Sequence, residues 1–313
     1  MRLTVFSTLA FAAALQAAPA FAGSPYSALY VFGDSLSDNG NMFSFTGGAS
    51  PSAAAGYWNG RYSNGPVAVE TMARGMEVPL YDSAYGGAKT GPNPAGGADH
   101  INAALTPFQL GVLGQVGRAT APAGSLDSSA LYLLWGGPND IFAMGATPPA
   151  VTVGTAVANM VQAAMQLYAD GAKHFYVPLM PDLGLTPASR AGGPVAMAGA
   201  TALTDAYNAA LRGALANVDA ATPDMDIKFF DSASFLRATV ADPAGHGFTN
   251  VTAPCIGGDC TGYLFFDGVH PTALAHGQLG IAFAAAVPEP ETYAMFLAGL
   301  GILGAVARRK RLA

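Results

Sequence analysis

Short apolar runs alternate with longer alanine-rich stretches along the middle of the chain. The runs are bounded by Gly, Pro or Asp and predict buried strands at residues 28–32, 130–135, 174–179 and 227–230, with a weaker candidate at 77–81. The stretches between them have apolar residues at helical spacing and predict helices at 66–74, 106–117, 149–170, 195–219 and 271–286. This alternation predicts an α/β fold in which helices cover both faces of a parallel sheet.

Two long loops interrupt the alternation, at residues 39–65 and 86–99. Both are rich in Gly and Pro and longer than ordinary connections, and long ordered loops commonly frame functional sites. The first contains Phe43, Tyr57, Trp58 and Tyr62, which either line an acyl or sugar pocket or cover the core. In open α/β sheets ligands bind beyond the carboxyl ends of the strands, so functional residues are expected directly after the strands.

The first 22 residues have the pattern of a secretory signal peptide. A positive charge at Arg2 precedes an apolar run at 3–15, and Ala20-Phe21-Ala22 supplies small residues at a cleavage site. The mature chain is therefore expected to begin near Gly23. The alternative interpretation is a buried N-terminal helix.

The other end of the chain has a Pro-Glu-Pro tripeptide at 288–290, an uncharged segment at 292–307 and a basic cluster at 308–311. As a helix the uncharged segment spans about 24 Å, less than the ~30 Å hydrocarbon core of a bilayer. The basic cluster favours retention on the cytoplasmic side of a membrane. The order of these parts resembles the PEP-CTERM sorting tail of Gram-negative bacteria, over residues 288–313.

That resemblance implies a transient inner-membrane anchor. An exosortase would cut it near the Pro-Glu-Pro tripeptide and release the protein to the cell surface or the extracellular space. A permanent C-terminal anchor is the alternative. The part between the two ends, residues 23–287, contains no internal repeat and is expected to form one domain.

Composition excludes two classes of protein. Hydrophobic residues make up 51% of the 313 and charged residues only 11%, against about 25% charged in an average soluble protein, which excludes a disordered solvated chain. Residues 23–287 hold nine Lys and Arg against eighteen Asp and Glu. Because binding to phosphate backbones requires basic patches, no nucleic-acid partner is expected.

Cys255 and Cys260 are the chain's two cysteines, spaced C-x₄-C around Gly257-Gly258. In the oxidising compartment to which an exported protein goes, such a pair predicts a disulfide. Closing so short a loop contributes about 2 kcal/mol in the chain-entropy model, so its expected role is to stiffen the segment before Asp267. With no His beside the pair and no H-E-x-x-H pattern, no metal site is expected.

The segment 33–41, Gly-Asp-Ser-Leu-Ser-Asp-Asn-Gly-Asn, directly follows the first predicted strand. Ser35 on the turn leaving that strand can present its hydroxyl at the end of the sheet, close to backbone amides. A hydroxyl is a poor nucleophile until an adjacent base removes its proton. The chain must therefore supply such a base.

His270 is the best candidate for that base because Asp267 lies three residues before it. On one helical turn the two side chains would lie on the same side, so that the carboxylate holds the imidazole in the tautomer that accepts a serine proton. Pro271 suits the start of the helix that follows. The other histidines fit less well: His100 and His246 lie in Gly-rich loops, His174 begins a strand, and His276 is expected to be exposed on the last helix.

Two glycine pairs also follow predicted strands. Gly136-Gly137-Pro138-Asn139-Asp140 comes after the strand at 130–135, and Gly86-Gly87 comes after the weak strand. Glycine allows close approach of the backbone, and an Asn amide is a hydrogen-bond donor. A developing oxyanion needs such donors, each worth about 3–4 kcal/mol of activation barrier. Taken singly, each pair is better explained by an ordinary turn.

Together these segments resemble the GDSL/SGNH hydrolase family of lipases and esterases. The resemblance covers residues 29–275 and is carried by the blocks at 33–41, 137–140 and 267–272 and by Gly-Arg-Tyr-Ser-Asn-Gly-Pro at 60–66. The second block departs from the family pattern. Members often have Asn-aromatic-Ala-x-Gly-Gly-Ala, where this chain has Tyr-Asp-Ser-Ala-Tyr-Gly-Gly-Ala at 81–88. The oxyanion glycine is therefore open between Gly86 and Gly87, with Gly87 preferred.

The resemblance implies a three-layer α/β/α sandwich with a flavodoxin-like parallel sheet of about five strands. It implies that Ser35 is the nucleophile, His270 the general base and then acid, and Asp267 the orienting carboxylate. The N–H groups of Ser35 and Gly87 and the side-chain amide of Asn139 would form the oxyanion hole. No metal or cofactor is implied.

The function so implied is that of a secreted serine hydrolase that cleaves carboxylic esters through an acyl-enzyme. The ester would belong to a lipid, a short-chain ester or an acylated polysaccharide. An acyltransferase and a polysaccharide O-deacetylase would use the same triad and are the alternatives within enzymes. Outside enzymes, the alternative is a non-catalytic surface or matrix protein.

Overall fold

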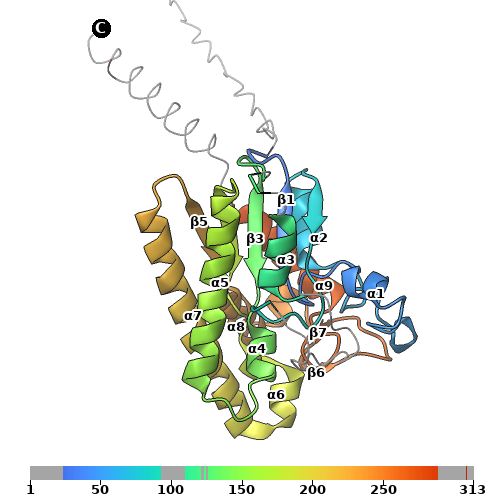
Figure 1. Cartoon of the computed structure of the whole chain (residues 1–313). Coiled ribbons are helices and arrows are strands. Elements are labelled where there is room, and N and C mark those ends of the chain that lie inside the picture. Colours follow the sequence, from blue (N-terminus) through green and yellow to red (C-terminus); the bar gives the residue numbers. More distant parts are fainter. Residues whose placement is uncertain (1–23, 93–109, 121–122, 125, 288–307, 309–313) are drawn as a thin grey trace, which may run out of the picture.

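The computed structural model describes residues 24–92, 110–120, 123–124, 126–287 and 308 (Figure 1). The predicted signal peptide, His100 and, apart from Arg308, the predicted sorting tail lie outside these residues.

A five-stranded parallel sheet forms the centre of the described part of the chain. The strands are β1 (Leu29–Gly33), β2 (Leu80–Asp82), β3 (Leu131–Trp135), β4 (His174–Pro178) and β5 (Asp226–Phe230). Their order is β2-β1-β3-β4-β5, the flavodoxin-like order. The predicted fold class and all five predicted strands are therefore confirmed.

Helices cover both faces of this sheet (Figure 1). Successive strand residues point to opposite faces, and residues on both faces are buried, so each face needs a covering layer. Leu29 and Val31 of β1 face α2 (Ala68–Gly75) and α9 (Ala273–Ala285), with α8 (Ser232–Ala241) farther along this face. Phe32 faces the other layer. That layer consists of α3 (Val112–Ala119), α5 (Pro149–Ala169) and α7 (Gly193–Ala221).

Several short elements near the carboxyl ends of the strands were not predicted from the sequence. The short helices are α1 (Asn41–Phe45), η1 (Ala53–Ala55), α4 (Pro138–Phe142), η3 (Leu183–Leu185), α6 (Pro187–Ala191) and η4 (Ala244–His246). The strands β6 (Asn250–Pro254) and β7 (Tyr263–Phe265) pair in parallel as a separate two-stranded sheet. Elements of three to five residues are too short to carry a recognisable periodicity.

Predicted boundaries differ from the observed ones where the backbone conformation changes. The helix expected from residue 106 begins at Val112, because Gly111 before it is extended. The weak strand begins at Leu80 rather than at residue 77, because Glu77 has φ 57° and belongs to the turn that follows α2. The last helix begins at Ala273, with Thr272 as its N-cap, so Pro271 lies outside the helix.

The expectation that His276 is exposed was wrong. Helix α9 is covered by the sheet and by α2, and His276 is 0% exposed. Its Nδ1 accepts a hydrogen bond from the Ala68 amide at 3.2 Å. Burial, with a smaller contribution from the nearby His270, lowers the pKa of His276 to about 3. The side chain is therefore a neutral link between two helices.

The burial of neutral His276 makes stability depend on pH. Below pH 6.5 the unfolded chain protonates this histidine and the folded chain does not, so unfolding becomes easier as pH falls from about 6.5 to about 3. We expect His276→Gln to remove about 2 kcal/mol of the stability lost between pH 8 and pH 5. Urea unfolding at the two pH values measures this difference. His246→Gln, at a half-exposed histidine, is the matched control, and an equal pH dependence in the wild type and in the His276 variant would contradict the assignment.

Candidate active site

Ser35 lies on a tight turn immediately after β1. The amides of Ser37 and Asp38 both donate to the Asp34 carbonyl at 3.0 Å, and Asp34 Oδ1 accepts from the Leu36 amide at 3.0 Å. The turn places Ser35, 8% exposed, on the wall of a pocket at the carboxyl end of the sheet. This is the position that the carboxyl-end rule predicts.

Asp267 and His270 lie in a short loop between β7 and α9. The loop is closed by the Phe266 amide, which donates to the His270 carbonyl at 2.8 Å. Asp267 Oδ1 accepts from the amides of Val269 at 2.9 Å and His270 at 2.7 Å. The expectation that these residues share a helical turn was wrong, because the carboxylate itself organises a bend that ends before the helix begins.

The structure brings Ser35, His270 and Asp267 together in a single hydrogen-bonded line. His270 Nε2 lies 2.7 Å from Ser35 Oγ, and His270 Nδ1 lies 2.7 Å from Asp267 Oδ2. Burial acts to raise the pKa of Asp267, but the attraction of His270 and the hydrogen bonds to the carboxylate outweigh it and lower that pKa to about 2. Asp267 is therefore ionised at neutral pH, as a carboxylate that orients a histidine must be.

Tyr57 also contacts this line, which the sequence did not predict. Its hydroxyl donates to Asp267 Oδ2 at 2.7 Å, the same oxygen that contacts His270 Nδ1. Burial and the charge of Asp267 raise the pKa of the Tyr57 phenol, so it stays a donor. From the sequence, Tyr57 is expected only to line a pocket or to cover the core, because no sequence spacing relates a residue of the long loop to Asp267.

The two candidate oxyanion glycines have different surroundings. The Gly86 amide donates to Asp38 Oδ2 at 2.7 Å. A Cβ at Gly86 would lie 2.1 Å from the Tyr62 ring. Gly87 lines the pocket and has φ 78°, a conformation that favours glycine. Within the described ranges the amides of Ser35 and Gly87 donate to no protein acceptor.

Asn139, in the first turn of α4, also lines the pocket. Its Nδ2 donates to the Ala88 carbonyl at 3.0 Å, directly after the Gly87 turn. An amide nitrogen carries two hydrogens, so the second can serve a ligand. Gly137 before it has φ 123°, and a Cβ there would lie 2.6 Å from Tyr207.

Asp38 connects the Ser35 turn to the Gly86 turn. Its Oδ1 accepts from the amides of Gly40 at 2.8 Å and Asn41 at 2.7 Å, and its Oδ2 accepts from Met42 at 3.2 Å and Gly86 at 2.7 Å. Burial raises the pKa of Asp38, while these four amides act to lower it. One buried carboxylate thus fixes the distance between the two turns that frame the pocket.

The predicted disulfide between Cys255 and Cys260 is present. The Cys255 amide donates to the carbonyls of Phe265 at 3.2 Å and Phe266 at 3.1 Å, and the Ile256 amide donates to Phe266 at 2.7 Å. The disulfide-closed turn therefore packs directly on the segment before Asp267, the segment that the sequence predicts it to stiffen.

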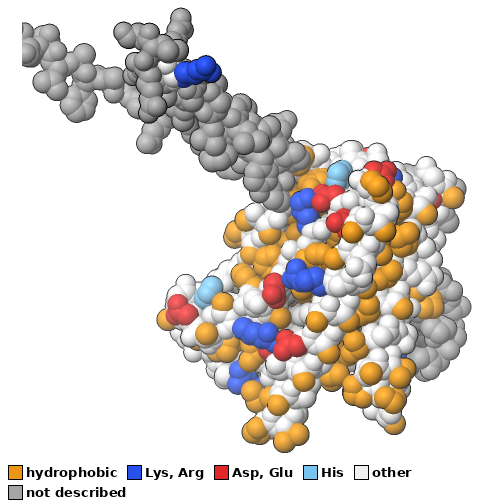
Figure 2. All heavy atoms as spheres, turned by 90° about the vertical axis from the view of Figure 1, so that its left-hand side faces the viewer, with side chains coloured by type: hydrophobic (Ala, Val, Ile, Leu, Met, Phe, Trp, Pro, Cys, Tyr) orange, Lys and Arg blue, Asp and Glu red, His pale blue; other side chains and the backbone are white. Residues whose placement is uncertain are grey.

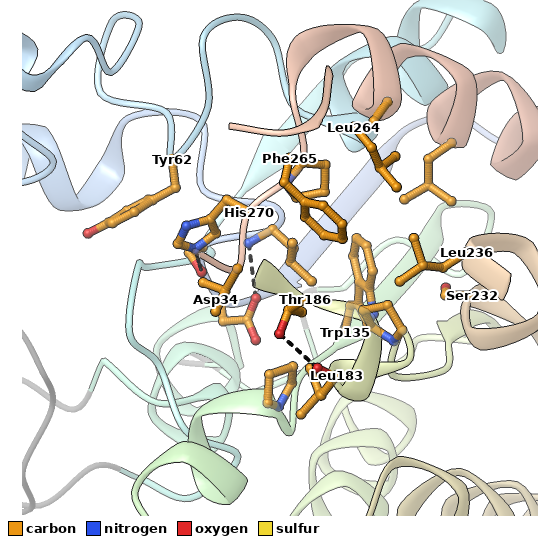
Figure 3. A pocket seen from close by; sticks show the side chains of 18 of the residues that line it. Asp34, Tyr62, Trp135, Leu183, Thr186, Ser232, Leu236, Leu264, Phe265 and His270 are labelled. Carbon is orange, nitrogen blue, oxygen red and sulfur yellow. Dashed lines mark hydrogen bonds between the residues drawn. The ribbon is translucent and has the colours of Figure 1, made fainter. Parts of the chain in front are cut away.

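The pocket beside Ser35 and His270 has a volume of about 460 Å³ (Figure 3). Its walls are predominantly apolar, with Tyr62 beside His270 and Trp135 and Phe265 farther in. Burial raises the pKa of Asp34, which also lines it, to about 7, although the Leu36 amide and His270 act to lower it. The size is that of an ordinary small-molecule site.

Charged side chains are sparse on the face seen in Figure 2, and several charged residues of the described chain form ion pairs. Lys173 lies 2.7 Å from Asp224, and Arg237 contacts both Asp182 and Asp205. In the described part of the chain no three His, Cys, Asp or Glu side chains gather as ligands around a metal ion would. The helices described also include none with the length and apolarity needed to traverse a bilayer.

Comparison with known proteins identifies the family. The profile of the GDSL-like lipase/acylhydrolase family matches residues 29–283. The chain belongs to this family. The PEP-CTERM protein-sorting motif matches residues 286–311, which indicates export sorting in a Gram-negative bacterium.

Relatives within the GDSL family include two enzymes from other bacteria. The chain is 30% identical over 312 residues to the esterase EstA of Pseudomonas aeruginosa, covering 83% of this chain and 46% of EstA, so it spans about half the length of that relative. It is 29% identical to the phosphatidylcholine-sterol acyltransferase of Aeromonas hydrophila, covering 81% of this chain and 88% of that enzyme. Among solved structures, an acetyl xylan esterase, AlAXEase, aligns with a TM-score of 0.47 at 12% identity, covering 83% of this chain and 99% of that one.

The position of Asp38 generates a prediction for stability. In Asp38→Asn, whichever oxygen becomes an amide nitrogen leaves two backbone N–H groups without an acceptor. We expect a loss of about 2–4 kcal/mol in urea unfolding, with faster hydrogen exchange at the Gly86 amide. Asp259→Asn is the matched control, because Asp259 also accepts from backbone and side chain but in an exposed turn. A loss no larger than that of the control would show that the four amides do not depend on Asp38.

Proposed function

We propose that this GDSL-family protein is an exported serine hydrolase that cleaves carboxylic esters through an acyl-enzyme on Ser35. The observation that carries the proposal is the 2.7 Å contact between Ser35 Oγ and His270 Nε2, beside backbone amides that have no protein acceptor within the described ranges. A serine so paired has a base within reach of its proton.

The first step is attack of Ser35 Oγ on the ester carbonyl carbon. His270 Nε2 takes the hydroxyl proton as the new C–O bond forms, and ionised Asp267 stabilises the resulting imidazolium through Nδ1. The amides of Ser35 and Gly87 and the Asn139 side chain stabilise the oxyanion. Their alignment before the reaction is what lowers the barrier.

Collapse of this intermediate expels the alcohol, which receives the proton from His270 and leaves an ester on Ser35. Water then enters, gives a proton to His270 and attacks the acyl carbon. The second oxyanion uses the same donors, and its collapse returns the proton to Ser35 as the acid departs. Each proton taken is returned, so this chain needs no cofactor for the cycle.

Transfer of the acyl group to a second alcohol is the other candidate, favoured by the likeness to the acyltransferase of Aeromonas hydrophila. The chemistry is the same until an alcohol replaces water in the second half. Removal of acyl groups from a polysaccharide would follow the hydrolytic cycle, with water as the acceptor in the second half of the reaction. Product analysis with added sterol, glycerol or acetylated polymer separates these reactions.

Export supplies the cellular context of the proposal. The sorting motif at 286–311 implies processing by an exosortase. We infer a signal peptide at 1–22, a hydrolase domain at 23–287 and a tail at 288–313 that anchors the chain in the inner membrane. Cutting the tail would release the protein to the cell surface or beyond.

The catalytic assignment predicts severe losses at two positions. Ser35→Ala removes the nucleophile and His270→Ala removes its base, and we expect kcat for a nitrophenyl butyrate to fall by at least about 10³-fold in each. The double variant should be no worse than either single variant, because the two residues act as one unit. Labelling with a fluorophosphonate should disappear in Ser35→Ala. Turnover or labelling close to wild type in that variant would refute the mechanism.

Tyr57 has a distinct signature in the kinetics. In Tyr57→Phe, Asp267 Oδ2 loses one of its two side-chain partners, so the carboxylate is held less firmly against His270 Nδ1. Because Asp267 then orients the imidazole less well, we expect kcat for a nitrophenyl butyrate to fall by about 10-fold while KM stays unchanged. Tyr168→Phe is the matched control, since its hydroxyl also donates to a carboxylate, that of Asp224, on the surface. A kcat in Tyr57→Phe equal to that of the control would assign Tyr57 a packing role alone.

A further inference from the structure

The pocket extends far beyond the groups that carry out the chemistry. It is lined by residues that follow four strands of the sheet: Ser35 after β1, Asn139 after β3, Leu183 after β4 and Ser232 after β5. These strands are adjacent in the order β1-β3-β4-β5. Three strand spacings of about 4.8 Å give the pocket a length of about 14 Å along the edge of the sheet.

The part of the pocket away from Ser35 is an apolar chamber. On the side away from the sheet edge it is lined by Leu236 of α8, Leu264 and Phe265 of β7 and Leu279 of α9. Figure 3 shows Leu236 across the pocket from His270, with Trp135 and Phe265 between them. A chain bound at Ser35 would therefore pass Trp135 and Phe265 to reach α8.

The polar side chains of this chamber are already engaged within the protein. The hydroxyl of Thr186 donates to the Leu183 carbonyl at 2.7 Å, and that of Thr239 donates to Phe235 at 3.0 Å. Gln278 Nε2 donates to the His246 carbonyl at 2.7 Å. Ser232 is the exception, with a hydroxyl that is unpaired in the described residues but shielded from solvent. A sugar placed here would lose its hydrogen bonds to water without replacement, which is costly.

We propose that the chamber is an acyl site and that the preferred substrates are esters of unbranched acyl chains of about ten to twelve carbons. The inference rests on the proposed esterase function and names its substrate class. Carbon–carbon bonds of about 1.5 Å in a zigzag advance about 1.3 Å per carbon, so about 14 Å holds a chain of this length. The volume leaves room for such a chain, because a cavity of about 150 Å³ holds one six-carbon benzene and this pocket is about three times larger.

The arrangement also fixes the direction of the substrate. With the carbonyl carbon at Ser35, the acyl chain follows the sheet edge toward β5, and the alcohol lies on the side of Tyr62 (Figure 3). Chain length is then measured by the distance from Ser35 to α8. Leu236, at the far end of the chamber, becomes the residue that sets the limit.

The test is a series of nitrophenyl esters from acetate to hexadecanoate, hydrolysed by the full chain. Each methylene moved from water into an apolar site is worth up to about fourfold. We expect kcat/KM for decanoate and dodecanoate to exceed that for acetate by at least about 100-fold and to rise no further beyond them. A maximum at acetate or butyrate would overturn the proposal. Absence of hydrolysis with every ester would instead refute the esterase function on which it rests.

Substitutions at Leu236 test the position of the chamber. Leu236→Trp should shift the optimum to chains shorter by several carbons, and Leu236→Ala should shift it to longer chains. Because the two substitutions shift the optimal chain length in opposite directions, either variant alone tests the proposal if the other folds poorly. Ala238→Trp is the matched control, because Ala238 is exposed on the same helix and does not line the pocket, so its chain-length profile should equal that of the wild type. Profiles that stay unchanged in both Leu236 variants would place the acyl chain elsewhere.

Discussion

The contact between His270 and Ser35 joins two parts of the fold that are built separately. Ser35 is fixed by the central sheet, through the turn that follows β1, whereas His270 is fixed by β7, the disulfide-closed turn and the start of α9. A 2.7 Å distance across this boundary requires both supports to be rigid. The close packing of α9 on α2 supplies part of that rigidity, since Gly280 leaves no room for a Cβ against the Ala68 carbonyl. Tyr57 spans the remaining gap from the long loop to Asp267.

Buried carboxylates hold the segments of the site in register. Asp38 binds the Gly86 amide, Asp140 accepts from both the amide and the hydroxyl of Thr90, and Asp267 organises its own loop. Burying such groups is unfavourable unless donors satisfy them. Each acid is therefore tied to a neighbouring stretch of backbone that cannot move without leaving a charge unpaired. The blocks of the family motif thus form one connected network rather than separate contributions to a pocket.

The sequence predicted the sheet well because buried parallel strands are apolar throughout and are bounded by turn residues. It also identified Ser35, Asn139, Asp267 and His270 as candidates. These residues lie in the three blocks at 33–41, 137–140 and 267–272, which carry the resemblance to the family. The sequence did not predict features that depend on contacts between segments distant in the chain. The hydroxyl of Tyr57 reaches Asp267 across 210 positions of sequence, and no local pattern encodes such a contact. His276 was misjudged because the composition of one helix does not reveal that a second helix covers it. The bend at 267–270 has the same i,i+3 spacing as a helix, and only the hydrogen bonds of Asp267 distinguish the two.

The direction of α9 connects the site to the sorting motif. This helix begins next to His270 and runs back along the sheet, so that Val287 packs in the same apolar cluster as Tyr26, just before β1. Tyr26 in turn contacts His174, the first residue of β4. The two ends of the domain therefore meet where the strands begin, while Ser35 and the acyl chamber lie where the strands end. Because the sorting motif starts at residue 286, the attachment and removal that we infer for it would take place at the pole away from the chemistry. The proposed enzyme would thus keep the same pocket geometry whether or not the tail is cut.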